Sequence, residues 1–253
     1  MRISKSLAIR RLSLCLFIGA ELLIYLLFMA RDMSGNADTT KLKYASVLLC
    51  FVFSLLWEKS NLKDNAIVSA AFVFTLIADV FLLLKNDKYE AGIISFLAVH
   101  SLYLIRLALI ARNFKSCDNS TEKVNIKAFR FINIVRVGVM ILLPLVIYLF
   151  LNDYFTATNI LAGECYCMLI SNAALCFCFL KNKKMRFFGI ALILFALCDF
   201  CVGAFNIFSH GFIYDFSSVM MWGFYLPSQV LICLSSVAFY KKTTINNNVK
   251  NIG

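Results

Sequence analysis

Residues 66–84 read AIVSAAFVFTLIADVFLLL, a run in which Asp79 is the one charged side chain. A helix needs about 20 consecutive apolar residues to cross the hydrocarbon core of a bilayer. This run is close to that length, and polar residues lie on both sides of it. The stretch therefore predicts a membrane-spanning helix that carries a carboxyl group inside the membrane.

The rest of the chain follows the same pattern. Of its 253 residues, 61% are hydrophobic and 15% are charged, whereas a soluble domain carries about 25% charged residues. This composition excludes both an ordinary soluble domain and a disordered chain. Eight apolar segments stand out, at 12–30, 44–57, 66–84, 91–111, 128–151, 158–180, 187–209 and 217–240. The short segment 44–57 either extends through Leu42 or does not cross.

We expect these segments to be helices, because an open sheet leaves backbone groups unsatisfied in lipid. The predicted fold is all-α, a polytopic membrane bundle of about eight transmembrane helices. Arg10 and Arg11 precede the first segment as in a signal peptide, but its apolar run is too long, so we interpret it as a retained anchor. Residues 1–240 are predicted to form one integral membrane domain, and the polar residues 241–253 a disordered tail.

The distribution of Lys and Arg predicts the orientation, because basic residues are enriched on the cytoplasmic side of membrane proteins. With eight spans and the N-terminus inside, 18 of the 25 basic residues fall in inner segments and 5 in outer loops. Omitting span 44–57 would reverse the orientation of every later segment and remove this asymmetry of basic residues. Both termini are therefore predicted to be cytoplasmic, in the plasma membrane if the cell is bacterial. The same pattern explains the net charge of +11, so no nucleic-acid partner is expected.

Ionisable residues inside membrane spans require an explanation, because placing a charged side chain at the middle of a transmembrane helix costs at least about 2.5 kcal/mol. Arg106 and Arg136 lie near cytoplasmic ends, where their long side chains are expected to reach the interface. Glu164 is close enough to the outer interface to do the same. The short side chains of Asp79 and Asp199 cannot. The full set of intramembrane polar residues is Glu21, Asp79, His100, Arg106, Arg136, Glu164, Asp199, Asn206, Tyr225 and Gln229.

Helical spacing groups several of these residues. Tyr225 and Gln229 are four residues apart and share a helix face. Asp199, Gly203 and Asn206 share another face, where Gly203 allows a neighbouring helix to approach closely. Together with the other polar groups at comparable depth, these faces predict one buried polar pocket. The alternative is a structural hydrogen-bond network that only ties helices together.

The ten cysteines are interpreted as packing residues, since nine lie in apolar runs and not in the extracellular loops where disulfides form. Cys198 and Cys201 have the spacing of a metal or redox pair, but no histidine is near them. With only His100 and His210 in the chain, a three-histidine zinc site is impossible. We therefore expect neither a metal nor an organic cofactor.

Four segments resemble the YhhN-like lysoplasmalogenase family in order and spacing. They are LIADVFLL at 76–83, FLAVHSLY at 96–103, LCD at 197–199 and FYLPSQVLI at 224–232. The resemblance covers residues 48–240. The chain departs from the family pattern at Ala78, Val99 and Cys198, where Gly, a smaller residue and Ser are common. Val99 would narrow the pocket.

The resemblance implies hydrolysis of the vinyl-ether bond of a lysoplasmalogen, with the lysophospholipid in the bilayer and water as substrates. The products are a fatty aldehyde and a glycerophospho-ethanolamine or glycerophosphocholine. Such a reaction needs a proton delivered to carbon and a carboxylate that stabilises the resulting cation, a division that two carboxyl groups achieve in glycoside cleavage. Asp79 and Asp199 fit this catalytic pair, and His100 fits as a proton relay or as a residue that orients one of them.

Further polar residues are candidates for contact with substrate or water, because their side chains donate or accept hydrogen bonds. These predicted binding residues are Tyr103, Glu164, Asn206, Tyr225 and Gln229. Two other function classes stay open. One is a small proton-coupled transporter, since intramembrane Asp and His also form proton relays. The other is a non-catalytic lipid-binding or scaffold protein. The sequence also leaves the oligomeric state open.

Overall fold

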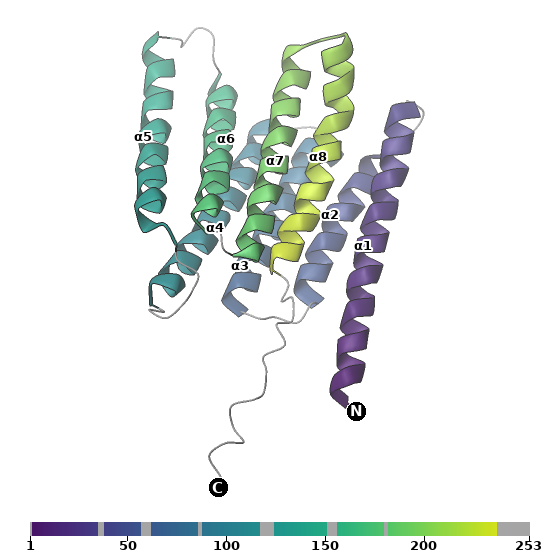
Figure 1. Ribbon diagram of the computed structural model, residues 1–253. Coiled ribbons are helices and arrows are strands. Elements are labelled where there is room, and N and C mark those ends of the chain that lie inside the picture. Colours follow the sequence, from purple (N-terminus) through teal and green to yellow (C-terminus); the bar gives the residue numbers. More distant parts are fainter. Residues whose placement is uncertain are drawn as a thin grey trace.

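The computed structural model describes residues 2–34, 38–56, 62–85, 88–116, 124–150, 156–179 and 182–236. Within these ranges the regular elements are all helical, which confirms the predicted all-α bundle (Figure 1). The elements are α1 (Arg2–Ser34), α2 (Thr40–Leu56), α3 (Leu62–Asp79), η1 (Val80–Lys85), α4 (Tyr89–Ser116), α5 (Ile126–Phe150), α6 (Ala157–Cys176), η2 (Phe177–Phe179), α7 (Lys183–Ile207) and α8 (Phe212–Ser236). The predicted tail 241–253 lies outside the described residues.

The helices follow the predicted apolar segments, but several are longer. α3 begins at Leu62 and not at residue 66, and α7 begins at Lys183 and not at residue 187. A helix can extend beyond its apolar run because its backbone hydrogen bonds are made within the helix. The polar side chains of the extension lie beyond the apolar run, where water solvates them. The start of α7 is fixed by Asn182, whose side chain accepts hydrogen bonds from the backbone N–H groups of Lys184 and Met185.

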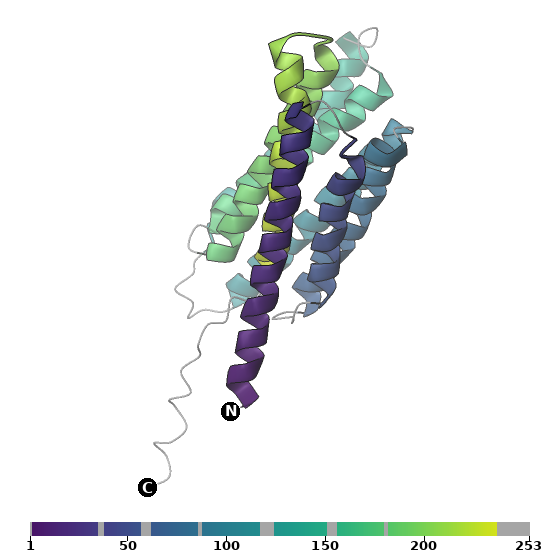
Figure 2. The same ribbon diagram turned by 90° about the vertical axis from the view of Figure 1, so that its right-hand side faces the viewer.

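Seven of the described helices are long and apolar enough to cross a membrane, so the chain is a multi-pass membrane protein. The remaining helix, α2, has 17 residues and spans about 26 Å, slightly less than a hydrocarbon core of about 30 Å. Figures 1 and 2 show that α2 nevertheless runs alongside its neighbours through the bundle. α1 begins and α8 ends at the same end of the bundle. We call this the inner end, because the basic residues predict that it faces the cytoplasm.

The helices surround a core formed mainly by two hairpins, α3–α4 and α7–α8. α6 packs against α4 and α7, and α2 packs against α3 and α8. α1 and α5 lie at opposite edges of the bundle (Figure 1), and most of their side chains are exposed, as contact with lipid requires. The core side chains include Phe72, Tyr103, Phe188, Phe195 and Leu226.

α1 is attached to the bundle by a buried carboxyl group. Glu21 is 5% exposed and accepts hydrogen bonds from the hydroxyl of Ser46 and the thiol of Cys50, both on α2. The rings of Phe17 and Phe53 stack beside this group, with centroids 4.0 Å apart. Glu21 is therefore paired across two helices, which offsets the cost of its burial.

The α3 helix changes its winding directly after Asp79. Residues Val80–Lys85 form a π-helical segment, η1, a rare conformation that occurs mostly as short bulges and frequently at functional sites. η1 packs tightly against the start of α4 at Gly92. A Cβ atom there would come within 2.6 Å of Cδ2 of Leu82, so Gly92 allows this close approach.

Arg106 is fully buried, so the prediction that it reaches the interface is wrong. Its guanidinium donates to both carboxyl oxygens of Asp64 at 2.7 Å and 3.1 Å and to the hydroxyl of Ser235 at 2.8 Å. It also lies 4.5 Å from the centroid of the Phe188 ring. These partners come from α3, α7 and α8, and they replace water inside the bundle. Arg136 is likewise buried, at 8% exposure, and donates to Asn133.

The Arg106–Asp64 pair generates a stability prediction. Asp64→Asn should lower the thermal melting temperature of the purified protein in detergent, because breaking a buried ion pair leaves an uncompensated charge and costs about 3 kcal/mol or more. The control is Asp215→Asn, an exposed aspartate at the outer end of α8. Equal melting temperatures for the two variants would show that the pair does not stabilise the bundle.

Candidate functional site

The centre of the candidate site is a hydrogen-bonded pair between α3 and α8. Asp79 is the last residue of α3 and is 3% exposed. The hydroxyl of Tyr225 lies 2.9 Å and 3.0 Å from the two carboxyl oxygens of Asp79 and donates to them. The structure thus brings together two of the predicted site residues, which lie 146 positions apart in the sequence.

His100 lies one aromatic layer away from this pair. The ring of Phe195, from α7, has its centroid 5.4 Å from that of His100 and 5.4 Å from that of Tyr225. The ring of Phe96 packs edge-on against the ring of Phe195. His100 is fully buried, and neither of its ring nitrogens has a hydrogen-bond partner among the described residues. The imidazole is therefore available to a ligand or to water.

Two further predicted residues are buried with an unpartnered polar atom. Tyr103 follows His100 by one helical turn, with ring centroids 6.0 Å apart, and its hydroxyl has no partner within the described part of the chain. Gln229 follows Tyr225 by one turn, and its carbonyl oxygen Oε1 is likewise unpartnered there. An unsatisfied buried polar group costs about 1–3 kcal/mol. We refer to Asp79, His100, Tyr103, Tyr225 and Gln229 as the core polar site.

The sequence analysis missed Asn172. This residue of α6 is fully buried and donates a hydrogen bond of 2.8 Å from Nδ2 to the backbone carbonyl of His100. Its own oxygen Oδ1 has no partner among the described side chains and backbone groups. The signal was present, because Asn172 is a polar residue in the middle of an apolar run, like Asn206.

Asp199 is half-buried on α7, one turn beyond Phe195. Its electrostatic neighbours are Tyr89 at the start of α4 and Cys165 and Tyr166 on α6. The thiol of Cys198 lies within electrostatic range of both Asp199 and Asp79. Both aspartates lie in the outer half of their helices. Among the described residues, no hydrogen bond or ion pair joins the Asp199 carboxyl group to the core polar site.

The remaining predicted residues lie further out. Asn206 is exposed and donates to the backbone carbonyl of Val202 in its own helix. Glu164 is half-buried, and its oxygen Oε1 has no partner within the described residues. The expectation that a helix approaches closely at Gly203 is wrong, because a Cβ atom there would meet nothing within 4 Å among the described atoms.

Most of the described cysteines are buried packing residues, and the thiols of Cys50 and Cys233 also donate hydrogen bonds. All of those in the described ranges are free thiols, and most, including Cys198 and Cys201, are buried. In the part of the chain that the structure describes, no group of three or more His, Cys, Asp or Glu side chains is placed so that it could hold a metal ion.

The core polar site has the groups that acid–base chemistry requires. A carboxyl group can release or accept a proton, the Tyr225 hydroxyl holds it in one orientation, and an unpartnered imidazole lies one ring away. The walls are aromatic and apolar, so electrostatic interactions within the site are stronger than in water. The arrangement suits a reaction on an apolar substrate that involves proton transfer.

The family comparison covers this whole site. The model of the YhhN family matches residues 38–236, a range that contains α2 to α8 and leaves out α1. Neither a curated protein nor a solved structure matches the chain. Because the family match covers well over half of the 253 residues, the chain belongs to the YhhN family.

Proposed function

We propose that this protein is a membrane hydrolase that cleaves the vinyl-ether bond of lysoplasmalogens to a fatty aldehyde and a glycerophospho-ethanolamine or glycerophosphocholine. Membership of the YhhN family supports the proposal, and the buried Asp79–Tyr225 pair carries it. A single-chain lipid can reach a site inside a bundle with its tail among the helices. In a bacterial cell, the plasma membrane would be the site of action.

The proposed chemistry needs one proton donor and one proton acceptor. A proton is transferred to the β-carbon of the vinyl group, which forms an oxocarbenium ion. Water then adds to the carbon bonded to oxygen and loses a proton, which gives a hemiacetal. Collapse of the hemiacetal breaks the bond between that carbon and the ether oxygen and releases the aldehyde and the alcohol. One water is consumed, and the proton donated in the first step is returned.

In this proposal, Asp79 and Asp199 are the catalytic carboxyl groups. One donates the proton, and the other stays ionised, stabilises the cation and accepts the proton of the attacking water. The hydroxyl of Tyr225 orients the Asp79 carboxyl by donating to both of its oxygens. Cys198, within electrostatic range of both aspartates, occupies the position where the family commonly has a serine.

The other polar groups have supporting roles in the proposal. His100 relays a proton between the aspartates and water. Tyr103 and Gln229 hold the water or the ether oxygen, since each has a buried polar atom without a partner among the described residues. Asn206 and Glu164 contact the glycerophosphate head group.

The carboxyl pair generates the first test of this function. Asp79→Asn and Asp199→Asn should each lower the rate of aldehyde release by at least about 100-fold, within the range that general acid–base groups contribute. The assay measures fatty aldehyde released from a lysoplasmalogen by the purified protein, with diacyl and lyso-acyl phospholipids as control substrates. Asp215→Asn at the exposed start of α8 is the matched control and should keep full activity.

Other outcomes of this assay would favour other functions. Full activity in either variant would remove that aspartate from the mechanism. Proton-coupled uptake into proteoliposomes without aldehyde release by the wild-type protein would favour a transporter. If neither activity is found and the two substitutions only change the melting temperature, the polar residues tie helices together and the protein is a scaffold or a lipid-binding protein.

Tyr225 is predicted to act by positioning Asp79. Tyr225→Phe keeps the ring contacts with Phe195 and Trp222 but removes the hydroxyl. We expect kcat to fall by about tenfold or more, since a hydrogen bond to a charged group is worth about 1.5–3 kcal/mol, while KM changes little. The control is Tyr214→Phe on the same helix, where the ring stacks on Phe205 at 4.5 Å. An unchanged kcat in Tyr225→Phe would refute the positioning role.

The close contact at Gly92 predicts an effect on activity from outside the site. Gly92→Ala should displace Leu82 and with it the π-helical segment that follows Asp79, so turnover should fall severalfold. Gly138→Ala is the matched control, because a Cβ atom at that helical glycine meets no described atom within 4 Å. Equal turnover in the two variants would show that the winding of η1 does not position the carboxyl group.

A further inference from the structure

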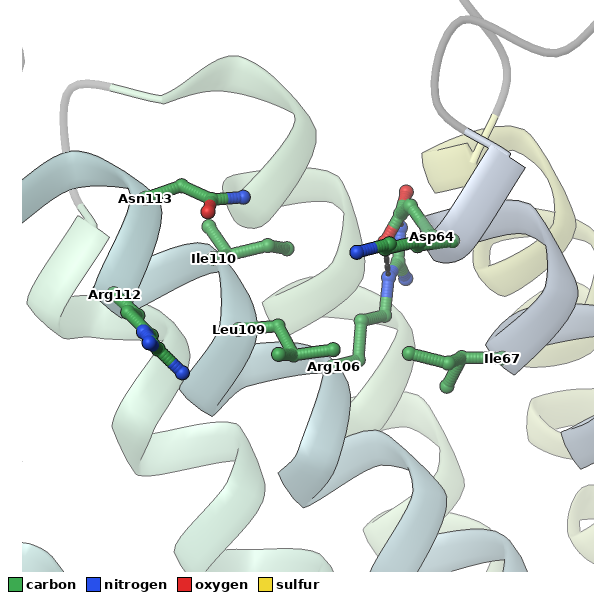
Figure 3. A pocket seen from close by; sticks show the side chains of 8 residues that line it. Asp64, Ile67, Arg106, Leu109, Ile110, Arg112 and Asn113 are labelled. Carbon is green, nitrogen blue, oxygen red and sulfur yellow. Dashed lines mark hydrogen bonds and ion pairs between the residues drawn. The ribbon is translucent and has the colours of Figure 1, made fainter. Parts of the chain in front are cut away.

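A cavity of about 360 Å³ lies at the inner end of the bundle, between the start of α3 and the end of α4. Figure 3 shows Arg106 reaching from α4 to Asp64 on one side of this cavity, and Ile110 and Asn113 on the other side. None of the residues that line this cavity belongs to the core polar site, so the two are separate features.

The lining of the cavity is basic. Lys63, Arg106 and Arg112 line it together with one carboxylate, Asp64. That carboxylate accepts two hydrogen bonds from Arg106, so its charge is already compensated. The cavity therefore favours an anion.

The walls of the cavity are apolar. Ile67, Leu109 and Ile110 line it next to the basic residues, and Leu109 is 38% exposed on the outside of the bundle. A small inorganic anion would leave this apolar surface unused. An amphiphile with an anionic head group would contact both the basic residues and the apolar wall, because its acyl chain can follow the helix surface into the bilayer.

The position in the membrane identifies the class of amphiphile. The basic residues predict that the inner end faces the cytoplasm, and the cytoplasmic leaflet carries anionic phospholipids, which bind in basic pockets between transmembrane helices. We propose that this cavity binds the phosphate head group of an anionic phospholipid of the cytoplasmic leaflet. The proposal is independent of the hydrolysis proposed above.

The test measures binding of phosphatidylglycerol to the detergent-purified protein by native mass spectrometry, with phosphatidylcholine as the neutral lipid. Lys63→Gln/Arg112→Gln should weaken phosphatidylglycerol binding by about 25-fold, since each basic residue at an anionic head group contributes about fivefold. Neither substitution removes a member of the Arg106–Asp64 pair, and the melting temperature of the variant checks that the fold is retained. The charge-preserving variant Lys63→Arg/Arg112→Lys should restore most of the affinity.

The matched control removes two basic residues from the same end of the molecule. Lys127→Gln/Arg130→Gln alters exposed residues at the start of α5 that do not line the cavity, and it should leave binding unchanged. Equal weakening in the two double variants would overturn the proposal, because the effect would then be one of overall charge. Binding of glycerol phosphate or inorganic phosphate as tight as that of phosphatidylglycerol would also overturn it, since the apolar wall would contribute nothing.

Discussion

A carboxyl group in the interior of a membrane bundle needs a hydrogen-bond donor within reach, and Tyr225 provides that donor to Asp79. The contact fixes the end of α3 against α8, the last helix of the bundle. The aromatic rings around it depend on this placement, because Phe195, Phe96 and Trp222 all pack against the Tyr225 ring. The pair therefore combines a structural role with the chemistry proposed for it.

The core polar site and the inner end are joined by packed side chains. The ring of Tyr103 lies edge-on to that of Phe188, with centroids 5.2 Å apart, and the guanidinium of Arg106 lies 4.5 Å from the centroid of the same Phe188 ring. His100 connects Tyr103 to Phe195 in the outer direction. A series of packed rings thus connects the Asp79–Tyr225 hydrogen bond to the Arg106–Asp64 ion pair at the inner end of the bundle.

Much of this arrangement was predictable from the sequence, and the features that were not predicted have physical causes. The apolar runs predicted the helices, and the cost of burying Asp79 and Tyr225 predicted that they have partners. The buried position of Arg106 was not predictable from hydropathy, because its partner Asp64 lies in a polar segment that continues the helix beyond the apolar run. The π-helical segment after Asp79 packs against Gly92, a tertiary contact that no local pattern reveals.

The attachment of α1 has a consequence for the biogenesis of the protein. Glu21 lies within the first span, but both of its hydrogen-bond donors lie on α2. If α1 entered the bilayer alone, it would hold an unpaired carboxyl group at a cost of at least about 2.5 kcal/mol. Entry of α1 and α2 together, as a helical hairpin, avoids this cost. The Glu21 contacts would therefore favour insertion of the first two helices as a unit.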